Sequence, residues 1–200
     1  MIKRSSLLLA GGLGTRMNGR EKALMMFEND TLLERSLSIL DDVSDEVIVS
    51  LRDERQVQDF SSYLQDRIMV TDRIRNVGPL AGMLAGFESG CGEYVFTVAC
   101  DMPYLNRTLI NMMFNMVGGH DALIPISKYG TKEPLHAVYR KDTMLEAIEK
   151  ALKEGNRSIL SPVSFLENVI YLDSEIIRTI DPDFKSFVNI NAPSDMLKLE

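Results

Sequence analysis

Residues 94–100 read YVFTVAC, an almost continuously apolar run that ends directly before Asp101. A strand with one face in water alternates apolar and polar residues, whereas a strand covered by helices on both faces is apolar throughout. The run therefore predicts a central strand of a parallel sheet that lies between two layers of helices. It also places Asp101 at the rim of that sheet, where the strand ends.

The segments on either side of this run alternate between two kinds. Short apolar runs predict further strands, and longer stretches with helical periodicity predict helices. The predicted strands are 6–10, 47–51, 67–71, 94–100, 122–126, 133–140 and 167–172, and the predicted helices are 31–40, 53–64, 80–89, 107–117 and 142–153. This alternation predicts an α/β fold with a predominantly parallel sheet.

Length and composition limit the class of protein. The chain has 200 residues, of which 45% are hydrophobic, and 22 Lys and Arg against 29 Asp and Glu give a formal net charge of −7. A chain of this size can bury a substantial core. We expect a single domain over residues 1–200, because no linker or internal repeat interrupts the pattern. The acidic balance argues against nucleic acid as a partner.

The cysteines and the apolar runs predict the compartment. Cys91 and Cys100 do not have the spacing of a redox or metal motif, so we expect two buried free thiols in a reducing environment. The apolar run that stops at Gly11 is shorter than the roughly 7–15 residues of a signal-peptide core. The sequence also lacks a run of roughly 18 apolar residues that could span a membrane. We therefore expect a cytoplasmic protein that does not bind membranes.

A glycine-rich loop follows the first predicted strand. Three glycines lie within residues 11–14, and Arg16 and Lys22 come shortly after them. Glycines let backbone N–H groups approach an anion, and the two cations can offset the charge of phosphate oxygens. Met17 and Glu21 stand where the dinucleotide fingerprint and the P-loop need glycine, so neither motif is present. The segment is a candidate phosphate-binding loop, with a plain glycine turn as the alternative.

Asp101 is a candidate ligand for Mg²⁺. Magnesium binds one or two carboxylates and completes its shell with phosphate oxygens and waters. The alternative role, capping the next helix, suits Asn106 better. Gly78 and Pro79 come at the start of another predicted helix. The N–H groups of its first turn would face the same rim and could bind an anion. The alternative is that Gly78 and Pro79 are only an ordinary helix start.

For the two histidines and Cys100 we favour structural roles over metal binding or catalysis. His120 and His136 lack a third ligand at metal spacing, so we expect structural roles, although His136 lies in a predicted strand and its side chain is a candidate to face the site. Cys100 has no evident general base and is expected to be buried as a small apolar residue.

Four ordered motifs resemble the molybdenum-cofactor guanylyltransferase (MobA-like nucleotidyltransferase) family. They are LAGG at 9–12 followed by Arg16 and Lys22, GPLAG at 78–82, CDMPYL at 100–105 and FVNINAP at 187–193, and they extend over nearly the whole chain. The resemblance implies a three-layer, Rossmann-like nucleotidyltransferase fold with a mixed, mainly parallel sheet. It also implies transfer of GMP from GTP to the terminal phosphate of Mo-molybdopterin, with Mg²⁺ as cofactor and release of pyrophosphate.

The same resemblance assigns roles to residues of this chain. The catalytic residues would be Arg16, Lys22 and Asp101, with Asp101 as the metal ligand. The nucleotide-binding residues would be Leu9, Ala10, Gly11, Gly12, Lys22, Ser50, Asp72 and Asp101. The pterin side would comprise Gly78, Pro79, Gly82, Asn189 and Asn191, with the segment 134–139. A molybdenum-loading protein and apo-molybdoenzymes are the implied protein partners.

The chain departs from the family pattern at Ser50, where an asparagine is familiar, at Asn18, where a glycine is usual directly after Met17, and at Ala192, where threonine is common. A serine hydroxyl reaches less far than an amide, so the resemblance implies nucleotidyl transfer more firmly than it implies guanine. The alternatives are a cytidylyltransferase for the same cofactor, another small-molecule nucleotidyltransferase, and a non-catalytic nucleotide-binding module.

Overall fold

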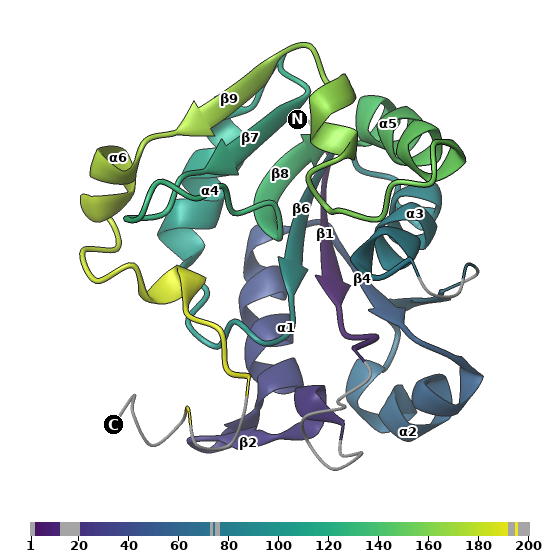
Figure 1. The fold of residues 1–200 in the computed structure, drawn as a ribbon. Helices are drawn as coiled ribbons and strands as arrows, with labels where there is room; N and C mark the ends of the chain where they lie inside the picture. Colours follow the sequence, from purple (N-terminus) through teal and green to yellow (C-terminus); the bar gives the residue numbers. More distant parts are fainter. Residues whose placement is uncertain (1–2, 13–20, 73, 75–76, 192–194, 196–200) are drawn as a thin grey trace.

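The computed structural model describes residues 3–12, 21–72, 74, 77–191 and 195. A seven-stranded sheet in the order β5-β4-β1-β6-β8-β7-β9 runs through its centre (Figure 1). The strands are β1 (Arg4–Leu9), β4 (Glu46–Leu51), β5 (Ile68–Thr71), β6 (Tyr94–Ala99), β7 (Ala122–Pro125), β8 (His136–Arg140) and β9 (Val169–Leu172). β8 is antiparallel to both of its neighbours, whereas the other paired strands of this sheet are parallel. The sheet is therefore mixed and mainly parallel, as expected.

Helices cover both faces of the sheet. They are α1 (Leu32–Val43), α2 (Glu54–Leu64), α3 (Pro79–Ser89), α4 (Arg107–Met116), α5 (Lys141–Lys153) and α6 (Ser174–Arg178). One apolar cluster joins the sheet to α1, α2, α4 and α6, and a second joins its other face to α3 and α5, which lie together in Figure 1. This arrangement confirms the three-layer α/β fold. Within the described residues, no helix is both long enough and apolar enough to cross a bilayer.

Local signals explain where the main elements begin. The predicted strands and helices are all present, with ends within three residues of their predicted positions. Thr31 caps α1 in a reciprocal pair with Glu34, Asp53 caps α2, and Asn106 caps α4 as expected. The short elements were not predicted: the hairpin β2 (Met26–Phe27) and β3 (Asp30–Thr31), α6, and the 3-10 turns η2 (Lys22–Leu24), η3 (Pro162–Phe165) and η4 (Lys185–Phe187).

The two cysteines have different environments. Cys100 is 7% exposed, and burial, with a smaller contribution from Asp101, raises the pKa of its thiol to about 12. Cys91 is exposed, which corrects the expectation that both thiols are buried. The reason is its position in the turn between α3 and β6, where its backbone N–H donates to Glu46 while its side chain faces solvent.

Thiol titration should therefore distinguish the two cysteines. We expect DTNB to modify Cys91 rapidly in the folded protein and Cys100 only after denaturation, because the thiolate is the reactive form. Cys91→Ser should remove the fast phase. A rapid reaction that survives this substitution would contradict the buried, protonated state of Cys100.

His136 is fully buried in β8, and neither ring nitrogen has a hydrogen-bond partner in the described part of the chain. Its ring centroid lies 5.1 Å from that of Phe96 and 4.8 Å from that of Phe187. Burial lowers the pKa of His136 to about 4, although Asp181 acts in the opposite direction. His136 therefore packs in an apolar layer against the C-terminal segment.

Acidification should destabilise the protein through His136. Between the ordinary histidine pKa of about 6.5 and the folded value of about 4, the unfolded chain binds a proton that the folded chain does not. As the pH is lowered through this window, the free energy of unfolding should therefore decrease, by up to about 3 kcal/mol. Urea unfolding of the wild type and of His136→Phe at several pH values isolates this contribution. Equal pH dependence in the two proteins would contradict it.

Candidate functional site

The carboxyl ends of the parallel strands meet at one edge of the sheet, which we call the rim. The chain leaves β1 there through Ala10–Gly12, leaves β5 at Asp72 and leaves β6 at Asp101. In Figure 1 the arrowheads of β1 and β6 point to the lower part of the picture, toward this edge. Ligands of open α/β sheets bind at this edge, and most of the predicted site residues lie there.

Lys22, Asp101 and Asn191 meet at the rim although they are far apart in the sequence. The Lys22 ammonium lies 2.7 Å from Asp101 Oδ2 and donates to Asn191 Oδ1 at 3.2 Å. The side chains of Lys22 and Asp101 are only 18% and 22% exposed. The backbone N–H of Ile190 donates to the Asp101 carbonyl at 2.9 Å, which anchors the C-terminal segment beside the pair. Two predicted catalytic residues and one predicted pterin-side residue therefore form one cluster.

The second carboxylate oxygen of Asp101 fits a magnesium ligand. Asp101 Oδ1 is buried and has no hydrogen-bond partner among the residues that the structure describes. An unpartnered buried acceptor is costly, and a cation would satisfy it. The described residues contain no group of three or more His, Cys, Asp or Glu that could hold a metal. Mg²⁺ can bind one carboxylate and take its other ligands from phosphates and water, so the single carboxylate of Asp101 would be enough to hold it.

Ser50, Asp72 and Gly82 form a second cluster. Ser50 lies within β4, 1% exposed, and its hydroxyl donates to Asp72 Oδ1 at 3.3 Å. Burial raises the pKa of the half-buried Asp72 carboxyl, and the Ser50 hydrogen bond opposes this. A Cβ atom at Gly82 in α3 would lie 2.4 Å from Ser50 Oγ and 3.0 Å from Leu9 Cδ2, so only glycine lets α3 approach this closely. Gly82, which is expected on the pterin side, thus packs against Leu9, Ser50 and Asp72, which are expected on the nucleotide side.

The remaining predicted residues are less closely grouped. Gly78 precedes α3 with φ of +63°, and Pro79 occupies its first turn, which confirms the predicted helix start. Asn189 is exposed, and its side chain donates to the Phe187 carbonyl at 3.5 Å within the same segment. Arg16 lies outside the described residues.

Arg52 and Gln56 were not among the predicted site residues, and Glu21 was noted only as a departure from the P-loop. Arg52 contacts Gly12 and Glu21, and Gln56 contacts Ala10 and Glu21. No local spacing pairs residue 21 with residues 52 and 56. Only the adjacency of β1 and β4 brings them together.

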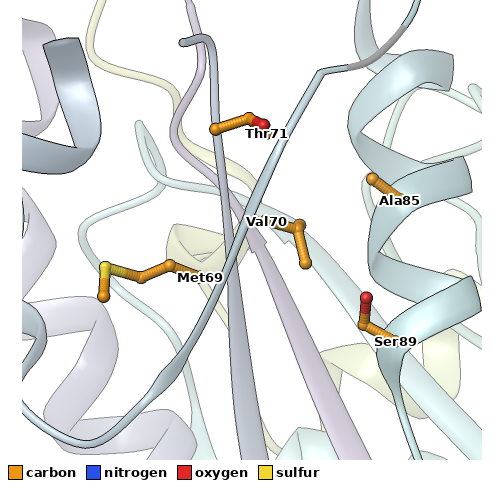
Figure 2. Close-up of a pocket in the computed structure, with 5 residues that line it drawn as sticks. All are labelled: Met69, Val70, Thr71, Ala85 and Ser89. Atoms are coloured by element: carbon orange, nitrogen blue, oxygen red, sulfur yellow. The ribbon is translucent and has the colours of Figure 1, made fainter. Parts of the chain in front are cut away.

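A small hollow of about 220 Å³ lies between β5 and α3 (Figure 2). Its lining residues are Met69, Val70, Thr71, Ala85 and Ser89. None of these side chains is charged or belongs to the clusters at the rim, so this hollow is not the candidate site.

Residues 6–169 match the family model of the MobA-like NTP transferase domain. The chain belongs to this family. A Methanosarcina mazei protein named probable molybdenum cofactor guanylyltransferase is 42% identical, over 96% of this chain and 88% of its own length. The crystal structure of molybdopterin-guanine dinucleotide biosynthesis protein A from Archaeoglobus fulgidus superposes with a TM-score of 0.82 at 31% identity, covering 98% of this chain and 96% of its own.

Membership in the MobA-like family makes the protein a nucleotidyltransferase. The fold is shared more widely, since 4-diphosphocytidyl-2C-methyl-D-erythritolsynthase from Anaerococcus prevotii has a TM-score of 0.71 at 15% identity, over 98% of this chain and 94% of its own. The fold by itself therefore does not distinguish the nucleotide or the acceptor. That distinction depends on the residues at the rim.

Proposed function

We propose that the protein is a molybdenum cofactor guanylyltransferase, which transfers GMP from GTP to the terminal phosphate of Mo-molybdopterin and releases pyrophosphate. The observation that carries the proposal is the Lys22–Asp101 contact beside the glycine-rich loop, with Asp101 Oδ1 left open to a cation. The relatives named above support the choice of guanine and of the acceptor.

In this reaction the main contribution of the protein is to position the two substrates and to stabilise the negative charge of their phosphates. An oxygen of the acceptor phosphate attacks the α-phosphorus of GTP in line, and the bond to pyrophosphate breaks without a covalent enzyme intermediate. Arg16, Lys22 and the N–H groups of the loop would offset the negative charge of the triphosphate. The Lys22 ammonium has three N–H donors. Two of them contact Asp101 and Asn191, so the third would bind a phosphate oxygen while the contact with Asp101 is kept. Mg²⁺ held by Asp101 would supply further charge neutralisation at the phosphate oxygens.

The two substrates are proposed to occupy opposite sides of the cluster formed by Lys22, Asp101 and Asn191. Leu9, Ala10, Gly11, Gly12, Ser50 and Asp72 would hold the nucleotide, and Gly78, Pro79, Gly82, Asn189 and Asn191 would line the pterin side. The contact of Gly82 with Ser50 and Asp72 indicates that the two sides meet at α3. The hydrogen bond from Lys22 to Asn191 brings the C-terminal segment beside the lysine that we propose to act in nucleotidyl transfer.

Thermal unfolding with each of the four nucleoside triphosphates, with and without Mg²⁺, tests the nucleotide site. A ligand at 100 times its Kd adds about 2.7 kcal/mol to the free energy of unfolding, which should raise the Tm by roughly 5–11 °C. We expect a Mg²⁺-dependent shift with GTP, followed by pyrophosphate release when molybdopterin is added. A larger shift with CTP would favour a cytidylyltransferase. Binding without pyrophosphate release would favour a non-catalytic module, and the absence of any shift would contradict a nucleotide site.

A further inference from the structure

The two described ends of the glycine-rich loop are tied together by side chains that the proposed function does not use. We propose that Glu21, Arg52 and Gln56, which we call the loop clamp, are positioning residues for nucleotidyl transfer. They hold the end at Ala10–Gly12 at a set distance from the end at Glu21–Lys22. The backbone N–H groups of one end and the ammonium of the other can then meet the same triphosphate. This inference rests on the proposed function.

Gln56 is the buried part of the loop clamp. It is 0% exposed and lies in the first turn of α2, where its backbone N–H donates to the capping carboxylate of Asp53. Its side-chain Nε2 donates to the Ala10 carbonyl at 3.0 Å and to Glu21 Oε2 at 2.8 Å. Its Oε1 accepts from the backbone N–H of Arg52 at 2.6 Å. One buried amide thus connects both ends of the loop to the turn between β4 and α2.

Arg52 makes a second connection between the end of the loop at Ala10–Gly12 and the end at Glu21–Lys22. Its Nη1 donates to the Gly12 carbonyl at 3.2 Å, its Nη2 lies 2.8 Å from Glu21 Oε1, and its Nε lies 3.0 Å from Asp53 Oδ2. A guanidinium presents its donors in a fixed planar fork and can hold several acceptors at once, which an ammonium at the end of a flexible stem does less well. The site therefore uses the shape of arginine as well as its charge.

The backbone packing supports the same role. A Cβ atom at Gly11 would lie 3.1 Å from the backbone nitrogen of Arg52 and 3.3 Å from the carbonyl carbon of Leu51, so the first end of the loop rests directly on the turn that carries Arg52. Glu21 lies 2.8 Å from Arg52, and Lys22, the next residue in the chain, lies 2.7 Å from Asp101. The loop clamp therefore fixes the backbone at Gly11 and Gly12 relative to the backbone from which Lys22 extends.

The exposure of the pair allows binding to be separated from stability. Arg52 and Glu21 side chains are 24% and 21% exposed, and a partly exposed ion pair adds little to the free energy of unfolding. We expect Arg52→Met and Glu21→Gln to remain folded, with a Tm near that of the wild type. Their Kd and KM for GTP should rise by about tenfold, because part of the binding free energy must then be used to order the two ends of the loop, while kcat changes less.

Two further variants test the geometry. Arg52→Lys keeps the charge beside Glu21 but not the fork, so it should fail to restore the affinity for GTP. The double variant Glu21→Gln/Arg52→Met should lose little more than either single variant, because both remove the same contact. Arg67→Met is the matched control. Arg67 directly precedes β5, at the edge of the sheet opposite the rim, and pairs with Asp41. Its removal should leave the Kd and KM for GTP unchanged.

The measurements are calorimetric binding of GTP with Mg²⁺, steady-state kinetics and thermal unfolding for each variant. If Arg52→Met lowers the Tm and leaves Kd and KM unchanged, the loop clamp is merely structural and the inference is overturned. Full rescue by Arg52→Lys would also overturn it, because charge alone would then suffice. A wild-type protein that binds none of the four triphosphates would instead overturn the proposed function and this inference with it.

Discussion

Asp101→Asn should lower kcat by a factor on the order of 10²–10³ at saturating Mg²⁺, as the removal of a key electrostatic contact does in other enzymes. Asparagine keeps the shape of the side chain but removes the negative charge that would face a cation from the buried Oδ1. It also removes the charge that holds the Lys22 ammonium at 2.7 Å. Pyrophosphate release with GTP and molybdopterin, measured over a series of Mg²⁺ concentrations, reports both effects.

The matched control for this variant is Asp41→Asn, which breaks the surface ion pair with Arg67 away from the rim. Its turnover and its dependence on Mg²⁺ should equal those of the wild type. Near-wild-type turnover of Asp101→Asn itself would contradict the assignment of Asp101 as the metal ligand. A fall in turnover with an unchanged response to Mg²⁺ would assign its effect to the loss of the Lys22 contact.

Lys22→Met should lower kcat/KM by a similar factor, on the order of 10²–10³. Methionine keeps most of the length of the side chain but cannot neutralise phosphate oxygens or donate to Asn191. It also leaves Asp101 Oδ2 without the partner that it has in the structure. Kinetics and calorimetric GTP binding together separate a loss of affinity from a loss of rate, and both are expected.

Lys3→Met provides the comparison for the loss of a lysine. Lys3 directly precedes β1 and therefore lies at the edge of the sheet opposite the rim. Its side chain is half exposed, and its ammonium lies 3.9 Å from Glu46 Oε2. Its kinetics should not change. The double variant Asp101→Asn/Lys22→Met should lose much less than the product of the two single effects, because the two side chains act as one unit. Fully multiplicative effects would argue against that coupling.

Much of the fold follows from local pattern. The apolar run of β6 predicted a strand covered on both faces, and Tyr94, Val95, Phe96 and Val98 are indeed almost fully buried. Asn106 caps α4 because its side chain accepts from Leu109 three residues later, a contact that sequence spacing alone defines. Such features depend on neighbours in the chain, and therefore the sequence contains the information needed to predict them.

Burial and orientation of single side chains were less predictable. Cys91 is an apolar residue type, yet the turn between α3 and β6 leaves it exposed, whereas Cys100 is buried. His136 was a candidate to face the site, and in the structure its ring packs against those of Phe96 and Phe187. These outcomes depend on which elements pack over each position, and periodicity does not specify that.

Periodicity, the positions of glycines and the order of the motifs determined the α/β class, the main elements and the residues that lie after each strand. The tertiary structure decided which of them meet: Lys22 contacts Asp101 and Asn191 across 79 and 169 positions of sequence, and Gln56 connects Ala10 to Glu21. Elements form through contacts between near neighbours, which a sequence displays directly. The site forms where strands that are distant in sequence become neighbours in the sheet, and this adjacency is set by how the apolar faces of all the elements are buried together.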